Sequence, residues 1–491
     1  MARKHSSKVQ PDPQQVSLER IRALLDPADF AAMLAEIQRP LPPAIRLNPL
    51  KATPSDLKDW CERYQWQVEP IPFCSSGYRL TSSQTNPGGT LEHLMGQYYI
   101  QEAASMLPPE LFDFNSMDTP LILDMAASPG GKTTHLISKT GDQGLVIAND
   151  SSADRIQALR LVLLTWGGLH TAVTQFPGER WGTWYPETFD AVLLDAPCSM
   201  QGLRGAESHT IRPITDHEIN GLARRQVGLL TSALQAVRVG GQVVYSTCTL
   251  TAEEDEGVLD ALLRRYPGAI QVEDVRDRIP VPAPALTQLP SGEQLDPQIA
   301  HALRLFPHRL GTAGFFAARL TKTAPIPVAE QIPPSRPLAQ AGFEPVTRSE
   351  QMRVVQALGF TYGFDLPVLL EQQAMELWHR DETLYLFPRQ FLIQFSGLPV
   401  ALLGLPLGDW QADTFIPSHE WLARFASACP YGWLTISDDD SGRWLQGADL
   451  PPIAEAVPPI CLIKDSAGRF LGRARAGKDR LKNLLPRRFF A

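Results

Sequence analysis

Short apolar runs alternate with longer amphipathic segments between about residues 118 and 250, and this alternation constrains the fold more than any other feature. The apolar runs are LILDMA, GLVIAND, FDAVLLDAP and GGQVVYSTC, and helical stretches such as ADRIQALRLVLLTWGG lie between and around them. Strands that alternate with helices are typical of βαβ units. The sequence therefore predicts an α/β fold with a Rossmann-like, doubly wound and largely parallel sheet. Such sheets bind ligands at the carboxyl ends of their strands.

Proline-rich stretches and changes of pattern divide the 491 residues into four parts. Residues 1–115 predict a small N-terminal α+β domain, in which the Thr-Pro-Ser at 53–55 opens one helix and LMGQYYIQEAASMLPPELF forms another. Residues 116–322 contain the sheet, and residues 323–338, with the stretch APIPVAEQIPPSRPL, form a linker. Residues 339–491 predict a C-terminal α+β region.

Composition and cysteine spacing exclude several classes of protein. The formal net charge is −8, and no apolar run approaches the roughly 18 residues that a membrane-spanning helix needs. The N-terminus, MARKHSSKVQPDPQQ, lacks the apolar core of a signal peptide, so we expect a cytoplasmic protein without a membrane partner. The 6 cysteines include no CxxC pair and no His/Cys ligand spacing, which predicts neither a disulfide scaffold nor a metal site.

A strand, a glycine-containing loop and the start of a helix follow one another in LILDMAASPGGKTTHL, residues 121–136. A phosphate-binding P-loop needs a glycine where this chain has Ala126, and the dinucleotide pattern GxGxxG is absent. A nucleoside-cofactor loop is the third interpretation: Gly130 and Gly131 would let the backbone approach the ligand, whose carboxylate would face the helix N-terminus. S-adenosyl-L-methionine fits this loop because it has a ribose and a carboxylate but no phosphate.

Asp150 ends the next predicted strand, GLVIAND, where a carboxylate can accept hydrogen bonds from both hydroxyls of a ribose. A strand-end aspartate is also a common helix cap or ion-pair partner. Its place one strand after the loop favours the ribose contact.

Two cysteines lie just beyond the ends of predicted strands, Cys198 in LLDAPCSM and Cys248 in VVYSTCTL. Both could be small buried hydrophobic residues, but Pro-Cys-Ser and Thr-Cys-Thr are turn-like contexts. Carbon 5 of cytosine is too electron-poor to attack a methyl sulfonium until a thiolate adds to carbon 6. This reaction needs a cysteine of lowered pKa, an acid near ring nitrogen 3 and a group that helps release the product. Asp195, Cys198 and Cys248 supply these residue types, with Lys132 and the bound cofactor as candidates to stabilise the thiolate.

Several motifs resemble those of the Sun-type (nucleolar-protein/Sun) RNA cytosine-C5 methyltransferases, and within them the bacterial type F enzymes for 16S ribosomal RNA. DMAASPGGKTTHL resembles the family's cofactor loop, DAPCS its Pro-Cys motif and YSTCTLTAEEDEGVL its Thr-Cys motif. RLNPLK, GQYYIQEAASM and GFFAARL are also similar, so the resemblance spans roughly residues 40–322. It implies a monomeric enzyme with a methyltransferase domain and an RNA-binding N-terminal domain, which methylates carbon 5 of cytosine in RNA from S-adenosyl-L-methionine.

The resemblance also implies residue roles. Cys248 is the expected nucleophile and Cys198 assists product release, whereas the DNA enzymes use only the Pro-Cys thiol as nucleophile. The expected catalytic residues are Cys248, Cys198, Asp195 and Lys132, and the expected cofactor contacts are Ala126, Ala127, Ser128, Pro129, Gly130, Gly131, Lys132, Asp150, Arg155 and Asp195.

Two positions depart from the family's pattern. The acidic residue that usually contacts the adenine end of the cofactor aligns with Pro177, and the sequence leaves open whether Glu179 or a backbone group takes its place. After DAPCS the usual glycine is Met200, which changes the expected substrate loop.

The C-terminal end is strongly basic, and the region from 339 resembles the extension of the type F enzymes, which ends in a PUA-like RNA-binding module. The nine basic residues could neutralise RNA phosphates, and a solvated terminal helix is the alternative. They are Lys464, Arg469, Arg473, Arg475, Lys478, Arg480, Lys482, Arg487 and Arg488.

RNA is therefore the expected partner, with small-subunit ribosomal RNA first and tRNA second. An alternative of another class is a ribosome-assembly factor that binds RNA but has a decayed active site. The intact Asp195, Cys198, Cys248 and Lys132 argue against this alternative, and Pro177 is its only support.

Overall fold

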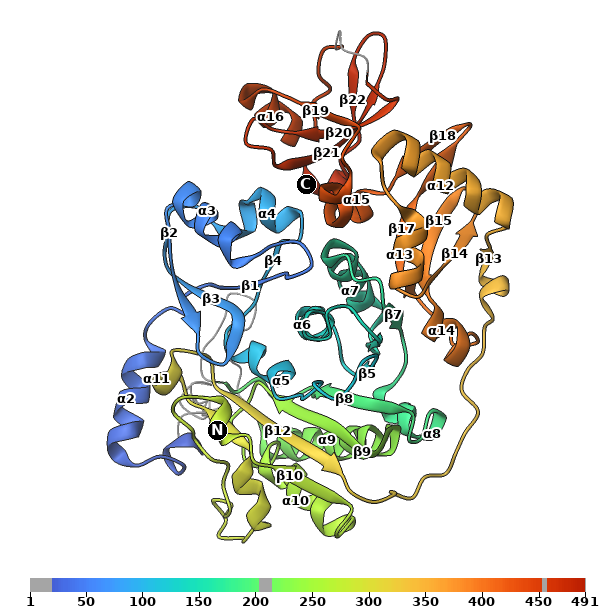
Figure 1. Cartoon of the computed structure of the whole chain (residues 1–491). Helices are drawn as coiled ribbons and strands as arrows, with labels where there is room; N and C mark the ends of the chain where they lie inside the picture. Colours follow the sequence, from blue (N-terminus) through green and yellow to red (C-terminus); the bar gives the residue numbers. More distant parts are fainter. Residues whose placement is uncertain (1–19, 203–213, 453–456, 491) are drawn as a thin grey trace, which may run out of the picture.

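The computed structural model describes residues 20–202, 214–452 and 457–490. A nine-stranded sheet with helices on both faces forms its centre (Figure 1). The order along the sheet is β10 (Ile270–Glu273), β12 (Phe315–Lys322), β9 (Val237–Thr247), β8 (Phe189–Asp195), β5 (Leu121–Asp124), β6 (Leu145–Asn149), β7 (Thr171–Thr174) and β16 (Leu402–Leu403), with β11 (Leu303–Leu305) paired to β12. Strands β5 to β9 are parallel, so the predicted Rossmann-like sheet is confirmed.

The central strands are apolar without interruption because both faces of the sheet are covered. Side chains alternate along β5: Leu121 and Leu123 belong to one core cluster and Ile122 to the other. One face carries α6 (Gly131–Lys139) and α7 (Ala153–Trp166), and the other carries α8 (Trp181–Trp184), α9 (Asp216–Ala236) and α10 (Glu256–Arg265) (Figure 1). The short strand β7, TAVT, is an element that the sequence pattern did not single out.

The N-terminal region forms a four-stranded sheet of order β2-β3-β1-β4. Its elements are α2 (Pro27–Ile37), β1 (Ala44–Leu47), α3 (Pro54–Tyr64), β2 (Trp66–Ile71), β3 (Cys74–Ser83) and β4 (Tyr98–Ile100). Helix α3 confirms the helix predicted at the Thr-Pro-Ser, and the Asp56 carboxylate accepts a 2.7 Å hydrogen bond from the Thr53 backbone N–H.

The second helix predicted for this region is wrong. In its place lie α4 (Leu91–Leu94), strand β4, a 3₁₀ turn and α5 (Leu107–Glu110). Gly96 breaks the helix: it has φ +70°, and a Cβ there would lie 2.2 Å from the Thr165 carbonyl oxygen of α7. The chain then extends so that Tyr98 pairs with Leu47 of β1.

Within the predicted linker, 323–338, residues 323–337 contain no helix or strand and follow an extended path, and a 3₁₀ turn begins at Leu338 (Figure 1). Two sheets follow, of order β13-β14-β15-β17-β18 and β19-β20-β21-β22. Their strands are β13 (Glu344–Pro345), β14 (Met375–Arg380), β15 (Thr383–Pro388), β17 (Leu405–Gln411), β18 (Thr414–Pro417), β19 (Trp433–Thr435), β20 (Ile460–Lys464), β21 (Phe470–Ala476) and β22 (Leu481–Asn483). The helices are α12 (Arg348–Tyr362), α13 (Leu366–Gln372), α14 (Arg389–Gln394), α15 (His419–Phe425) and α16 (Asp438–Leu445). The basic end is thus a hairpin and a 3₁₀ turn, and the alternative of a terminal helix is wrong.

The C-terminal region is not independent of the catalytic sheet. Strand β16 adds antiparallel to β7, and Phe391 and Phe395 belong to the same core cluster as the central strands. The Arg424 guanidinium of α15 pairs with the buried Asp142 carboxylate of the catalytic domain. Leu91 of α4, in the N-terminal region, shares an apolar cluster with Trp444 of α16 in the C-terminal region. Cutting the chain at the linker would therefore expose apolar surface of the catalytic domain itself.

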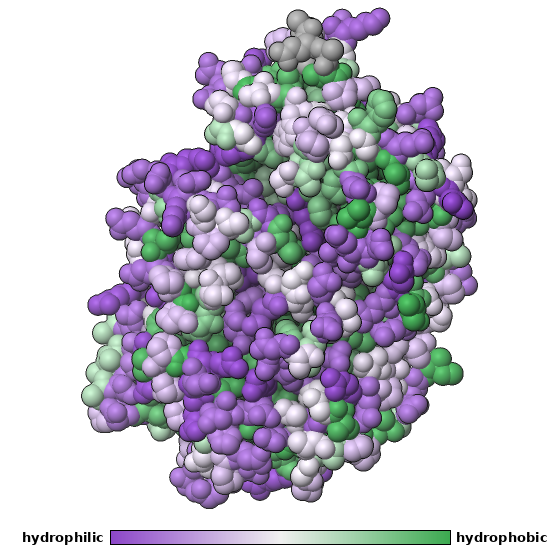
Figure 2. Space-filling view, viewed as in Figure 1, coloured by the Kyte–Doolittle hydropathy of each residue, from purple (hydrophilic) through white to green (hydrophobic). Residues whose placement is uncertain are grey.

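The face seen in Figure 2 is largely hydrophilic, with apolar side chains in small scattered groups. Within the described ranges, no helix has the length and apolar character needed to cross a membrane. The polar N-terminal stretch considered above, residues 1–15, lies outside the described residues.

Candidate active site

Two neighbouring parallel strands bring the two predicted thiols together. Strands β8 and β9 pair so that Asp195 lies opposite Ser246. Cys198 follows Asp195 by three residues, and Cys248 follows Ser246 by two. The two Sγ atoms are 3.1 Å apart, and both cysteines are free and partly buried. This spacing allows a hydrogen bond between a thiol and a thiolate. Both sulfur atoms can therefore reach a single ligand at this edge of the sheet.

The proton in this pair has a preferred place. The hydrogen bond to Cys248, burial, and the nearby charges of Cys248 and Glu254 raise the pKa of Cys198 well above its usual value. Cys198 therefore holds its proton more firmly than an ordinary cysteine does.

Lys132 and Asp195 form an ion pair beside the thiols. The Lys132 ammonium donates a 2.7 Å hydrogen bond to Asp195 Oδ2 and lies 5.6 Å from the centre of the Phe315 ring. Burial lowers the pKa of Lys132, but the Asp195 carboxylate outweighs it and the net shift is upward. Asp195 Oδ1 accepts a 2.7 Å bond from Ser246 Oγ. The closest partner of Lys132 is thus the carboxylate, the nearby Cys248 also raises its pKa, and its expected role in stabilising a thiolate stays a prediction.

The loop after β5 passes from Ala126 to Gly131 and leads directly into α6, as the sequence predicts. Gly130 has φ +115°, and a Cβ on it would come within 2.9 Å of Val162 in α7; a Cβ on Gly131 would come within 2.9 Å of Tyr99. Both glycines are thus required by helix and strand packing, a reason that the sequence analysis missed. No side chain of the described residues caps α6, which leaves its first N–H groups available to an anion.

Asp150 lies at the end of β6, buried beneath the loop. Its Oδ2 accepts a 3.3 Å hydrogen bond from the Ser128 N–H, and its Oδ1 a 3.0 Å bond from Ser152 N–H. Arg155 lies 3.5 Å from the same carboxylate and also donates to the Ser128 carbonyl. A carboxylate has about four lone-pair sites, so Asp150 can still accept from a ligand. The structure therefore brings Ser128, Pro129, Asp150 and Arg155 to one place, as expected.

If Asp150 receives the two ribose hydroxyls, Asp150→Ala should weaken cofactor binding by ~1–3 kcal/mol, because their acceptor is lost. Isothermal titration calorimetry with S-adenosyl-L-methionine measures this directly. Asp154→Ala is the matched control, since Asp154 is an exposed carboxylate in the first turn of α7. Equal affinities in the two variants would place the ribose contact elsewhere.

Asp124 ends β5, directly before the glycine-containing loop. It is fully buried; Thr133 Oγ1 donates to its Oδ2 at 2.7 Å, while Oδ1 has no partner among the described residues. Burial raises the pKa of Asp124 to about 7, with Asp195 and Asp150 adding to the effect and Thr133 and Lys132 opposing it. An ammonium group, such as the one in S-adenosyl-L-methionine, would satisfy the free oxygen.

The raised pKa of Asp124 predicts a pH-dependent stability in the cofactor-free protein. An unfolded aspartate ionises near pH 4, whereas folded Asp124 stays protonated up to about pH 7, so folding becomes less favourable across that interval. Asp124→Asn resembles the protonated form at every pH. The free energy of unfolding of Asp124→Asn, measured relative to that of wild type, should therefore rise by about 2 kcal/mol between about pH 5.5 and about pH 8. Urea unfolding of both proteins tests this, and parallel pH profiles would contradict it.

The two positions that depart from the family's pattern now have defined surroundings. Pro177 is exposed, and Glu179 accepts a 3.2 Å bond from Arg225 of α9. Phe176 is held by Asn149, whose Oδ1 accepts its N–H at 3.0 Å. Met200 has φ +56°, in the left-handed region that favours glycine, which explains why a glycine is usual there. Its side chain is 47% exposed beside the thiols.

One cluster of potential metal ligands lies elsewhere, between the N-terminal domain and α6. It consists of Cys74, Glu110 and His135, whose ligand atoms lie within 4.8 Å of one another. The oxygens of Glu110 are already engaged by His135 at 2.9 Å and Lys139 at 2.7 Å. This arrangement satisfies the carboxylate without a metal ion, and the expectation of no metal stays a prediction.

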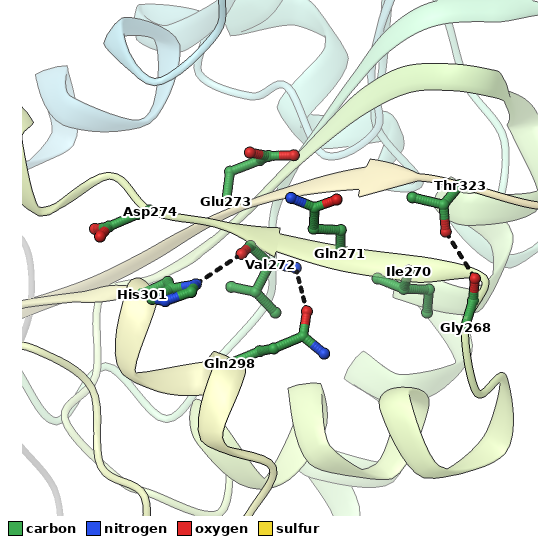
Figure 3. A pocket seen from close by; sticks show the side chains of 9 residues that line it. All are labelled: Gly268, Ile270, Gln271, Val272, Glu273, Asp274, Gln298, His301 and Thr323. Carbon is green, nitrogen blue, oxygen red and sulfur yellow. Dashed lines mark hydrogen bonds between the residues drawn. The ribbon is translucent and has the colours of Figure 1, made fainter.

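A pocket on edge strand β10 is separate from the thiols. Figure 3 shows Gln298 and His301 beneath this strand, with Val272 N–H donating to Gln298 Oε1 at 3.4 Å and His301 Nδ1 bonding to the Val272 carbonyl at 3.0 Å. Glu273 and Asp274 give the pocket an acidic rim. Strand β12 separates β10 from β9, which leads to Cys248, so this pocket lies at the edge of the sheet, apart from the two thiols.

A parallel sheet with a glycine loop after its central strand, a carboxylate after the next strand and two thiols after strands β8 and β9 defines a Rossmann-like methyltransferase. Comparisons with known proteins agree with this class. Residues 112–321 match the family model of 16S rRNA methyltransferase RsmB/F, and residues 15–103 match that of the N-terminal domain of 16S rRNA methyltransferase RsmF.

Two similar proteins align with this chain over most of their length. Ribosomal RNA small subunit methyltransferase F of Erwinia tasmaniensis is 35% identical over 98% of this chain and 97% of its own. The protein of the same name from Shewanella oneidensis is 33% identical over 92% of each chain. The chain therefore belongs to the 16S rRNA methyltransferase RsmB/F family, and it is an S-adenosylmethionine-dependent RNA methyltransferase.

Solved structures support the fold of the catalytic part. A methyltransferase homolog protein from Pyrococcus horikoshii superposes with a TM-score of 0.54 and 30% identity, covering 64% of this chain and all of its own. NSun6 from Pyrococcus horikoshii gives a TM-score of 0.52 at 19% identity, covering 64% of this chain and 98% of its own, and shows the fold alone.

Proposed function

We propose that this protein methylates carbon 5 of a cytosine in 16S ribosomal RNA through a covalent bond between Cys248 and carbon 6 of the base. The 3.1 Å distance between Cys198 Sγ and Cys248 Sγ carries this proposal. A single thiol would suffice for addition. A second thiol at this distance indicates that a later step of the same reaction uses a thiol of its own.

The chemistry assigns a step to each thiol. The Cys248 thiolate adds to carbon 6, and the electron pair of the 5,6 double bond makes carbon 5 nucleophilic. S-adenosyl-L-methionine supplies the methyl group when bound. A base then removes the proton from carbon 5, the double bond re-forms, and the Cys248 sulfur leaves carbon 6. Cys198 is adjacent to this bond and assists the release.

The proton held by Cys198 supports this order of roles. The raised pKa of Cys198 favours its protonated thiol, which lies 3.1 Å from Cys248 Sγ and can donate a hydrogen bond to it. An accepted hydrogen bond stabilises a thiolate. In this proposal the Lys132–Asp195 pair borders the base, with Asp195 toward ring nitrogen 3 and Lys132 holding its carboxylate in place.

The cofactor residues follow from the loop and its surroundings. We assign the methionine carboxylate to the N–H groups that begin α6, and the ribose to Asp150 with Arg155 beside it. Backbone groups from Ala126 to Gly131 line the same path, and Asp195 borders the methyl donor. Phe176, rather than Glu179, is the candidate for the adenine end, because Glu179 is engaged by Arg225.

RNA targeting is the proposed role of the flanking regions. We infer that the N-terminal domain (residues to 115) and the region 339–491, ending in a PUA-like module, hold RNA around the thiols. Among the described residues, Lys478, Lys482 and Arg487 are exposed and have no ion pair, whereas Arg480 pairs with Asp449 at 3.1 Å. Both thiols and the loop come from one chain, so we expect a monomer.

Nucleoside analysis tests this function. The protein is incubated with methyl-tritiated S-adenosyl-L-methionine and small ribosomal subunits, free 16S ribosomal RNA or tRNA, and the RNA is digested. We expect label in 5-methylcytidine from the ribosomal samples. Label mainly from tRNA would change the substrate, and binding of RNA without any label would favour an assembly factor with an inactive site.

A further inference from the structure

A buried carboxylate joins the loops that carry the two thiols. Glu254 is fully buried; its Oε2 accepts a 2.9 Å hydrogen bond from the Ser199 N–H, and its Oε1 accepts a 2.8 Å bond from Thr251 Oγ1. Ser199 directly follows Cys198, and Thr251 lies three residues after Cys248. We propose that Glu254 is a positioning residue that fixes Cys198 relative to Cys248, so that release of the methylated base can follow addition. This inference rests on the proposed two-thiol function.

A chain of hydroxyl groups completes the link. Ser199 Oγ lies 3.0 Å from Thr249 Oγ1, which lies 2.5 Å from Thr251 Oγ1. Each hydroxyl can donate one hydrogen bond and accept others, so the row forms a continuous link that ends on the carboxyl group of Glu254. The residues that immediately follow the two cysteines are thereby bonded to each other, and Glu254 ends the chain.

Glu254 is also linked, through Gln226, to the residue that precedes Cys198. Gln226 of α9 donates from Nε2 to Glu254 Oε2 at 3.0 Å and to the Pro197 carbonyl at 2.9 Å. The carbonyl before Cys198 and the N–H after it are therefore both fixed. Reacting groups lose rate steeply when they shift by about 1 Å, so this anchoring bears directly on the step that uses Cys198.

Glu254 does not itself touch the base. Its oxygens are taken by Ser199, Gln226 and Thr251, and its side chain has no exposure to solvent. Its role is therefore geometric. A glutamine can reproduce this geometry: its oxygen can accept from Ser199 and Gln226, and its amide nitrogen can donate to Thr251 Oγ1.

The test compares Glu254→Ala, Glu254→Gln and the control Glu253→Ala. Glu253 is the preceding carboxylate, partly exposed and 3.3 Å from Arg20. In Glu254→Ala we expect turnover to fall on the order of 10²-fold, with a covalent protein–RNA adduct accumulating, and the KM for RNA and the affinity for S-adenosyl-L-methionine within a few-fold of wild type. Glu254→Gln and Glu253→Ala should stay close to wild type and form no persistent adduct.

Wild-type turnover in Glu254→Ala, or an equal defect in Glu254→Gln, would overturn the inference. If Glu254→Ala does not fold, Thr251→Val removes the hydrogen bond to Glu254 with little change of volume. This variant should also accumulate the adduct, and a Thr251→Val variant without adduct would equally overturn the inference. Failure of the two-thiol function itself would be seen differently, because Cys198→Ala would then accumulate no adduct or wild type would yield no 5-methylcytidine.

Discussion

Cys248→Ala should lose methyl transfer by more than about 10⁴-fold while its affinity for S-adenosyl-L-methionine stays close to that of wild type. The sulfur is needed to activate carbon 5, and the neighbouring Cys198 thiol is a poor substitute because its pKa is raised. The measurement is tritium transfer to RNA together with calorimetry of cofactor binding. Cys61→Ala, a partly buried thiol in α3, is the control and should be fully active. Substantial turnover in Cys248→Ala would remove the basis for the covalent mechanism.

Cys198→Ala should fail at a later step. The covalent bond to RNA still forms and the methyl group still transfers, but release of the base stalls because the neighbouring thiol is missing. A slow-migrating protein–RNA band should therefore accumulate on a denaturing gel in the presence of cofactor. The double variant Cys198→Ala/Cys248→Ala should show no such band. A band in Cys248→Ala but not in Cys198→Ala would mean that the two roles are exchanged.

The pairing of the thiols could be predicted from the sequence because strand ends are local features. Cys198 and Cys248 follow apolar runs that read clearly as strands, and parallel neighbours bring their carboxyl ends to one edge. Asp150 follows from the same argument. The order of the strands across the sheet, by contrast, depends on crossovers, and the sequence pattern does not fix it.

What the sequence could not show depends on contacts between distant segments. The Lys132–Asp195 pair joins residues 63 positions apart, and the link from Ser199 to Glu254 spans 55. In the sequence, EEDE at 253–256 looks like a solvated acidic run, yet Glu254, Asp255 and Glu256 are fully buried. Asp255 accepts a 2.6 Å bond from Thr247, and Glu256 is paired with Arg304. Local charge therefore gave no indication of their burial.

The C-terminal region shows the same limit. Its proline-rich linker was recognisable from composition, but the addition of β16 to the edge of the catalytic sheet was not, because a two-residue strand carries no pattern of its own. Likewise, the break at Gly96 arises from the close approach of α7, about 70 positions away in the chain.

Mass spectrometry of the trapped adduct tests the central claim most directly. Cys198→Ala is incubated with RNA and cofactor, the adduct is isolated, and it is digested with trypsin and nuclease. The tryptic peptide 239–264 contains Cys248 as its only cysteine. We predict that this peptide carries one cytidine nucleotide with the additional mass of a single methyl group. A nucleotide attached to any other peptide, or the absence of any attached nucleotide, would contradict the assignment of Cys248 as the nucleophile.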